Sequence, residues 1–281
     1  MATAKDLKRF SDSMPLEGKT MPMLFVGHGN PMNAIEDNEF SRGWQMIGKE
    51  LPKPRAVLCI SAHWETKGTY VTAMERPETI HDFYGFPVEL FEVRYPAPGS
   101  PELATETKDV IKKGAVELDQ SWGLDHGCWS VVRHMYPEAN VPTIEMSLDY
   151  TKPALWHYEL ARELSMLRSK GVLIIGSGNM VHNLRLADWQ HPDETFDWAL
   201  ETNGRFKQLI SNNDHRSLID YQQLGRPAEL SIPTPEHYLP MLYVLGLKGE
   251  DEEIKFFNDR TLLGSISMTS FSVGYPSRIG A

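Results

Sequence analysis

Short apolar runs that alternate with amphipathic stretches limit how this chain can fold. Each run has the length of one buried strand, and each stretch between runs is long enough for a helix. Strands that alternate with helices form a mainly parallel sheet with helices on its two faces. The sequence therefore predicts an α/β fold, a single domain with a central, mostly parallel sheet flanked by helices on both faces. The clearest strands are expected at residues 21–26, 55–62, 141–148 and 171–178.

Start and stop signals locate several further elements. A helix over 100–114 begins with a Ser-Pro pair, and a helix over 153–171 begins with proline and ends with glycine. A third helix over 193–213 is expected to carry Asp193 and Glu194 in its first turn, where the helix dipole favours carboxylates. Near the C-terminus, residues 262–274 alternate like a half-buried strand.

A single domain is enough to account for the 281 residues. The chain shows no internal repeat, low-complexity tract or linker. We therefore expect a polar N-terminal lead over residues 1–20, followed by one folded domain over residues 21–281.

Charge and cysteine usage exclude several classes of partner. The formal net charge of -10 argues against nucleic acid or an anionic membrane as the partner. The N-terminal lead lacks the apolar segment of a secretory signal, and no later apolar run is long enough to cross a bilayer. Cys59 and Cys128 lack the spacing of a zinc motif, and we interpret them as small buried side chains. These features predict a cytoplasmic protein, and the sequence gives no prediction of its oligomeric state.

Histidines follow three of the expected strands. His28 comes directly after the first strand between two glycines, His63 ends the second, and His182 follows the last. The carboxyl ends of parallel strands form the edge where α/β proteins bind ligands, so these imidazoles are expected at one rim of the sheet. A fourth, His237, is expected in the first turn of a helix that Thr234 caps.

The remaining histidines point to no shared site. A single histidine is usually a surface residue or a hydrogen-bonded core residue, and only placement at the strand ends distinguishes the first group. We interpret four others as structural, because their helical or loop stretches show no convergent pattern: His134, His157, His191 and His215.

Seven blocks between residues 22 and 246 resemble, in their order, the class III extradiol ring-cleavage dioxygenases of the LigB type. Within that class the resemblance is greatest to the 4,5-DOPA extradiol dioxygenase group. It implies that the domain cleaves the aromatic ring of a catechol with dioxygen at a mononuclear metal. The blocks are GHGNPMN, SAHW, IHDFYGFP, YPAPGSP, DHGCW, SGNMVHN and IPTPEHYLPMLYVLG.

The resemblance implies a metal site made of His28, His63 and His237, with His182 beside it as the catalytic acid/base. Three protein ligands leave positions for both catechol oxygens and for dioxygen. Fe(II) is the implied metal for catalysis, and Zn(II) is possible in the same site, where His182 can become a fourth ligand. Glu236 is expected to face away from the metal, because neighbours in a helix point about 100° apart.

Residues around the metal are expected to contact the substrate. His126 matches a family position that contacts substrate oxygen or dioxygen, although a buried histidine beside Asp125 is an equal alternative. His81 and Asp82 lie in an aromatic segment that is expected to form a loop over the site. Tyr238, next to His237, is expected either to hydrogen-bond a substrate group or to have only a structural role.

Two other functions remain open at this point. A zinc-dependent hydrolase could use three histidines, with Glu236 as its base, although the chain has no HExxH motif. A non-catalytic metal-binding relative could keep the pocket, although it would not need a titrating group such as His182. The favoured partners are a small aromatic catechol and dioxygen.

Overall fold

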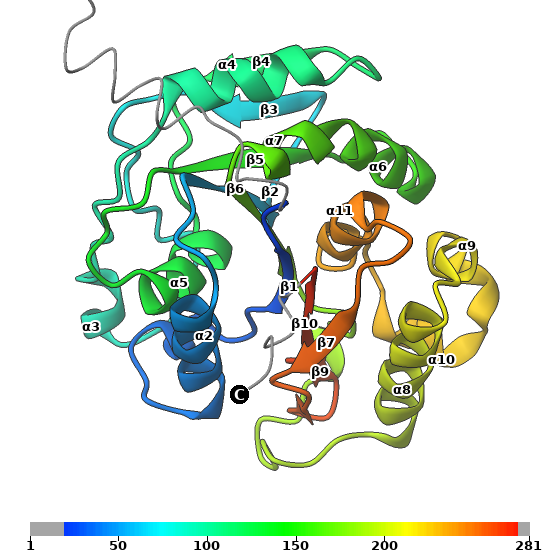
Figure 1. Cartoon of the computed structure of the whole chain (residues 1–281). Helices are drawn as coiled ribbons and strands as arrows, with labels where there is room; N and C mark the ends of the chain where they lie inside the picture. Colours follow the sequence, from blue (N-terminus) through cyan, green and yellow to red (C-terminus); the bar gives the residue numbers. More distant parts are fainter. Residues whose placement is uncertain (1–19, 275–281) are drawn as a thin grey trace, which may run out of the picture.

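The central sheet has eight strands in the computed structural model, which describes residues 20–274 (Figure 1). Their order is β4-β3-β5-β2-β6-β1-β10-β7. Strands β5, β2, β6 and β1 run parallel at its centre, whereas β10 and β7 are antiparallel at one edge. The mostly parallel α/β sheet predicted from sequence is confirmed. The strands are β1 Met23–Gly27, β2 Ala56–Thr66, β3 Thr69–Thr72, β4 Val116–Asp119, β5 Thr143–Asp149, β6 Val172–Gly178, β7 Ile254–Phe257 and β10 Ser270–Val273.

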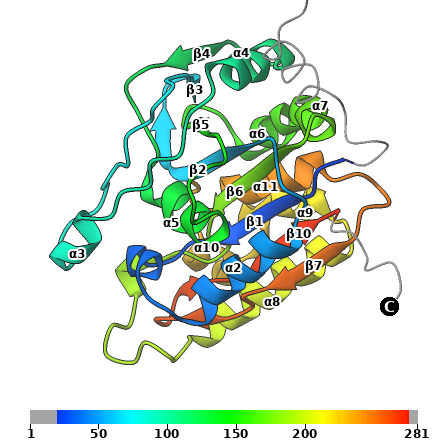
Figure 2. The ribbon, with the colours of Figure 1, turned by 60° about the vertical axis from the view of Figure 1, so that its left-hand side comes forward.

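Helices cover both faces of this sheet (Figures 1 and 2). Alternate residues of β1 show the division: Met23 and Phe25 pack into one apolar core, and Leu24 and Val26 into the other. Helices α2 and α5 cover the second core, and α6 and α11 lie on the opposite face. The α-helices are α2 Glu39–Glu50, α3 Val88–Phe91, α4 Pro101–Val110, α5 His126–Met135, α6 Ala154–Ala161, α7 Ser165–Ser169, α8 Asp197–Ser211, α9 His215–Ile219, α10 Arg226–Ser231 and α11 Leu239–Leu247.

Two of the predicted helices occur where their start signals lie. Ser100 caps α4 by accepting a hydrogen bond from the Leu103 N–H. The predicted 153–171 helix is divided into α6, a 3-10 turn over Arg162–Leu164, and α7, and the chain then turns at Gly171 with φ of 79°. Glycine adopts this left-handed conformation without steric cost.

The predicted start of the third helix is wrong. Helix α8 begins at Asp197, so Asp193 and Glu194 precede its first turn. The backbone of Glu194 and Phe196 instead exchanges hydrogen bonds with Gly264. This pairing holds the segment extended until Asp197.

The C-terminal prediction of one half-buried strand is also wrong. Residues 262–274 are divided among β8 (Thr261–Leu262), β9 (Ile266–Ser267) and β10, with left-handed turns at Leu263 and Gly264. Strand β10 is buried throughout because it lies between β1 and β7.

The element that carries His237 differs from the predicted helix start. Helix α11 begins at Leu239, so His237 lies in the preceding turn. Thr234 does not cap it, because its hydroxyl donates to Glu236. The carbonyl of His237 accepts a hydrogen bond from the N–H of Asn179, which fixes this turn to the end of β6.

Most of the predicted N-terminal lead lies outside the described residues, which begin at residue 20. Within residues 20–274, no helix has the length and apolar character required to span a membrane.

Candidate active site

Five histidines meet near the carboxyl ends of the central parallel strands. His28 directly follows β1, and His182 lies in the loop after β6. His63 lies within β2, beyond its last pairing with β6 and in a stretch where the register with β5 shifts. His126 is the first residue of α5, and His237 immediately precedes the N-cap of α11. The predicted convergence of strand-end imidazoles is therefore present, although His63 is inside its strand rather than after it.

The rings of His28, His63 and His237 form a nearly equal-sided triangle. Their centroids are 4.9 Å apart for His28 and His63, 5.3 Å for His28 and His237, and 5.0 Å for His63 and His237. Imidazoles that bind one ion through nitrogens at about 2.1 Å have centroids roughly 4.6 to 5.3 Å apart. The Nε2 atoms of His28 and His63 lie 3.0 Å from each other, which also suits two neighbouring ligands. These three residues fit a mononuclear metal.

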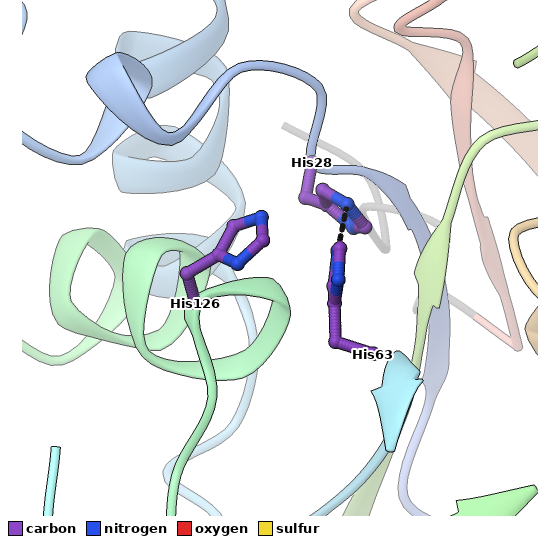
Figure 3. A group of neighbouring side chains, drawn as sticks. All are labelled: His28, His63 and His126. Atoms are coloured by element: carbon purple, nitrogen blue, oxygen red, sulfur yellow. Dashed lines mark hydrogen bonds between the residues drawn. The ribbon is translucent and has the colours of Figure 1, made fainter. Parts of the chain in front are cut away.

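The ligand atoms group differently from the ring centroids, because neither group of mutually close donors contains all three histidines of the triangle. The ring nitrogens of His28, His63 and His126 lie within 4.8 Å of one another, as do ligand atoms of His182, Glu236 and His237. Figure 3 shows the rings of His28, His63 and His126 gathered from three separate elements. The site thus offers more nitrogen donors than one open metal centre requires.

Hydrogen bonds orient the rings of His28 and His237. The Ser177 hydroxyl donates to the Gly127 carbonyl, so its oxygen accepts the Nδ1–H of His28 at 3.0 Å. The carboxylate of Glu236 can only accept, so the Nδ1–H of His237 donates to it at 3.0 Å. Both rings therefore keep an unprotonated Nε2, which is the form that binds a metal.

Burial keeps these imidazoles neutral. Burial is the largest cause that lowers the pKa of His28, His63 and His237 well below the usual histidine value, and neighbouring histidines lower it further. Burial, and then the nearby His126, lowers the pKa of His182 to about 4. Neutral rings at physiological pH are ready to bind a metal or to accept a proton.

His182 and His126 lie on different sides of the triangle. The ring of His182 stacks on His237 with centroids 3.5 Å apart. The ring of His126 is 3.9 Å from that of His63. His126 is 4% exposed and is held by Asp82, so it is a buried hydrogen-bonded histidine as well as a neighbour of the metal site.

Asp82, in the loop that was expected to lie over the site, makes contacts that the sequence did not predict. Its carboxylate accepts hydrogen bonds from the backbone N–H and the ring of His126 and lies 3.4 Å from Nδ1 of His63. Burial raises the pKa of Asp82, but its hydrogen bond and charge interaction with His126 outweigh burial and lower it overall. The sequence feature that could have indicated a site role for Asp82 is its position directly after His81.

His81 and Tyr238 are less close to the metal triangle than the sequence predicted. The Nε2 of His81 lies 3.1 Å from the carbonyl oxygen of Val93, and its ring packs near Trp129. Its segment is a loop, as expected, and Asp82 is its link to the site. Tyr238 is 1% exposed, and its hydroxyl donates to the Leu218 carbonyl, so the prediction of a substrate contact for Tyr238 is wrong.

The residues interpreted as structural do not join the site. Cys59 and Cys128 are buried free thiols. Each of the four other histidines has its own partner: His134 with the Asn33 carbonyl, His157 with Tyr243, His191 with Asp188 and His215 with Tyr158. These four histidines therefore have core or surface positions and are not part of the five-histidine cluster.

Comparison with known proteins agrees with this geometry. The family model described as the catalytic LigB subunit of aromatic ring-opening dioxygenase matches residues 22–271. The chain is 46% identical over 258 residues to the 4,5-DOPA dioxygenase extradiol of Escherichia coli (strain K12), which covers 90% of this chain and 95% of that protein. It is 34% identical to the 4,5-DOPA dioxygenase extradiol of Beta vulgaris, over 92% of this chain and 98% of that protein.

A solved structure shows the same fold. The crystal structure of an uncharacterized protein from Escherichia coli K12 superimposes with a TM-score of 0.79 at 42% identity, covering 90% of this chain and all of that one. With the five clustered histidines and a family match across nearly the whole domain, the chain belongs to the LigB family of aromatic ring-opening dioxygenases.

Proposed function

We propose that this protein is an extradiol dioxygenase that opens the ring of a DOPA-like catechol with dioxygen, at a ferrous ion held by His28, His63 and His237. The observation that carries the proposal is the triangle of three neutral imidazoles, each from a different element, of which His28 and His237 are buried and His63 is partly buried. Membership of a ring-opening dioxygenase family supports the same reaction.

Bound ferrous iron supplies the redox chemistry and the open positions that a catechol and dioxygen require, whereas zinc has no accessible redox change. The residues of the chain keep those positions open by supplying donors from one side. Zn(II) fits the same nitrogens, with His182 close enough to His237 to serve as a further donor.

His182 is the proposed acid/base. Its pKa of about 4 means that the ring is unprotonated at neutral pH and accepts a proton first. The sequence interpretation expected titration near neutrality, and burial moves the pKa below that range. A catechol hydroxyl placed beside the metal would give its proton to this ring and later recover one from it. His126 on the other side is proposed to hydrogen-bond substrate oxygen or dioxygen, and His81 to border the substrate from the loop.

The geometry gives less support to the other two functions. Glu236 would have to activate water in a hydrolase, yet its Oε1 already accepts hydrogen bonds from Thr234 and His237. A non-catalytic relative would have no use for the stacked, unprotonated His182. The cytoplasm is the proposed compartment, because the buried cysteines are free thiols.

Isotopic oxygen tests the proposal. Protein loaded anaerobically with ferrous iron is mixed with DOPA or another catechol and labelled dioxygen, and the ring-opened product is analysed by mass spectrometry. Both labelled atoms should enter the product, and the zinc-loaded protein should give no ring opening. A product without label, or ester or amide hydrolysis by the zinc form while the iron form ignores every catechol tried, would contradict the proposal.

A further inference from the structure

The carboxylate of Asp82 has two distinct hydrogen-bonding sides. Its Oδ1 accepts the backbone N–H of His126 at 2.9 Å. Its Oδ2 lies 2.8 Å from Nδ1 of the His126 ring and 3.4 Å from Nδ1 of the His63 ring. The side chain is 15% exposed, so little water competes for these contacts.

We propose that Asp82 is a positioning residue that fixes the tautomer of His126 and so presents an unprotonated Nε2 to the substrate. An ionised carboxylate can only accept, so Nδ1 of His126 must carry the ring proton. In the neutral form of the ring the lone pair is then on Nε2, which can accept a hydrogen bond from a catechol hydroxyl. This inference rests on the proposed function insofar as His126 faces the substrate.

Anchoring the loop is not the main role of Asp82, because other contacts already hold that loop. Ile80 and Leu124 are joined through the Ile80 N–H and the Leu124 carbonyl at 2.7 Å. The indole of Trp129 donates to the Ile80 carbonyl at 2.8 Å. We therefore expect the loop to stay in place when the carboxylate is changed.

Asp82→Asn is a sharp test because the backbone N–H of His126 cannot change its role. That N–H requires the amide oxygen of the new side chain, which leaves the amide NH₂ opposite Nδ1 of the ring. Two donors cannot face each other, so the ring proton must move to Nε2. A nearly isosteric change thus converts the acceptor that faces the substrate into a donor.

Asp188 and His191 provide a matched control on the surface. The Oδ1 of Asp188 accepts the backbone N–H of His191 at 3.2 Å, and its Oδ2 lies 2.9 Å from Nδ1 of that ring. The same two contacts therefore occur where the histidine side chain is 57% exposed and outside the five-histidine cluster. Asp188→Asn should change the tautomer preference of His191 and leave catalysis unchanged.

Nitrogen NMR of protein with ¹⁵N-labelled imidazoles reads the tautomer directly. The metal-free and zinc-loaded proteins are both diamagnetic, and His126→Gln identifies the His126 signals by their loss. In the wild type, Nδ1 of His126 should be protonated and Nε2 unprotonated. In Asp82→Asn the two signals should exchange character. A wild-type ring protonated at Nε2 would overturn the proposal without any variant.

Turnover gives the second readout, at saturating ferrous ion because the new amide also faces His63. Asp82→Asn should lower kcat by about 10²-fold while KM changes by less than about tenfold. Asp82→Ala removes the constraint without imposing the wrong tautomer, so its kcat should fall less. Two outcomes would refute the proposed role. One is an inverted tautomer in Asp82→Asn with unchanged kcat, and the other is an equal loss of kcat in Asp82→Asn and Asp82→Ala with the tautomer unchanged.

If the wild type opened no catechol, the proposed function would fail, and the nitrogen spectra would still decide the tautomer assignment.

Discussion

The Nδ1–H of His237 donates to the carboxylate of its sequence neighbour Glu236 at 3.0 Å. The sequence interpretation did not predict this contact. It expected Glu236 only to face away from the metal, from the 100° spacing of a helix, whereas both residues lie in the turn before α11. In this turn the carboxylate holds Nδ1 of the ring and leaves Nε2 as the nitrogen that is free to bind a metal.

Removing this carboxylate should weaken metal binding. Glu236→Ala is expected to lower the affinity for ferrous iron or zinc by roughly 10- to 100-fold, because an oriented and polarised imidazole is a better ligand. Glu236→Gln should lose less, since its amide oxygen can still accept the Nδ1–H. Glu229→Ala on α10 removes an exposed carboxylate and is the control. Metal titration of the apoproteins measures the affinities, and equal affinity for all variants would refute the orienting role.

The third metal ligand can be identified by comparing two histidines. His237→Ala should abolish stoichiometric metal binding, whereas His126→Ala should retain it, because the proposed ligand set is His28, His63 and His237. Metal content after anaerobic loading, measured by elemental analysis, decides between them. Loss of metal only in His126→Ala would make His126 the ligand with His28 and His63, and would remove His237 from the assigned set.

Replacing the acid/base should separate catalysis from binding. His182→Ala is expected to retain ferrous iron and to lower turnover by roughly 10² to 10⁴, the usual contribution of a positioned proton carrier. Its ring stacks on His237 without occupying the triangle. Metal content and single-turnover rates measure the two effects. His191→Ala, at an exposed position, is the control. Parallel loss of metal and rate would identify His182 as a ligand instead.

The sequence was informative where residues repeat a pattern or match a motif. The β1 strand and the Ser100 cap follow from local preferences, and the strand-end position of His28 follows from the geometry of a parallel sheet. The family motifs were confirmed by the match over residues 22–271. These features depend on local sequence preferences or on the resemblance of the motifs to a known family.

Features that depend on tertiary pairing were not predicted. Asp193 and Glu194 read as a helix start, but backbone pairing with Gly264 prevents the helix there. Tyr238 reads as a site residue from its position next to His237, but its side chain points into the core, where its ring contacts Phe206 and Tyr221. The hydrogen bond between Ser177 and His28 joins residues that are 149 positions apart in the sequence, and no local sequence pattern predicts it.

Close approach of two backbones at the site should make Gly178 intolerant of a side chain. A Cβ at this position would lie 2.1 Å from the carbonyl oxygen of His237. Gly178→Ala is therefore expected to displace the turn that carries His237, to destabilise the fold and to weaken metal binding. Gly204→Ala, in the exposed middle of α8 with open space around the new Cβ, should instead stabilise by about 0.5 to 1 kcal/mol. Thermal unfolding and metal titration of both variants test this contrast. Equal stability and equal metal affinity of the two variants would contradict it.

A buried histidine away from the metal should make folding stability depend on pH. Burial lowers the pKa of His157 to about 4, and the nearby Asp149 only partly opposes this. The ring is fully buried, with Nδ1 3.0 Å from the Tyr243 hydroxyl and Nε2 without a hydrogen-bond partner among the described residues. Between pH 6.5 and 4 the unfolded state therefore binds more protons at this position than the folded state.

The free energy of unfolding should consequently fall as the pH is lowered through this window. For His157 alone the loss between about pH 7.5 and about pH 5 is on the order of 2 kcal/mol. Urea unfolding of the metal-free protein at the two pH values measures it, and His157→Gln should lose correspondingly less than the wild type. His191→Gln is a control of opposite sign, because Asp188 raises the pKa of His191 and the charged ring stabilises the folded state at the lower pH. Identical losses in the wild type and His157→Gln would show that His157 is not the group whose protonation destabilises the fold.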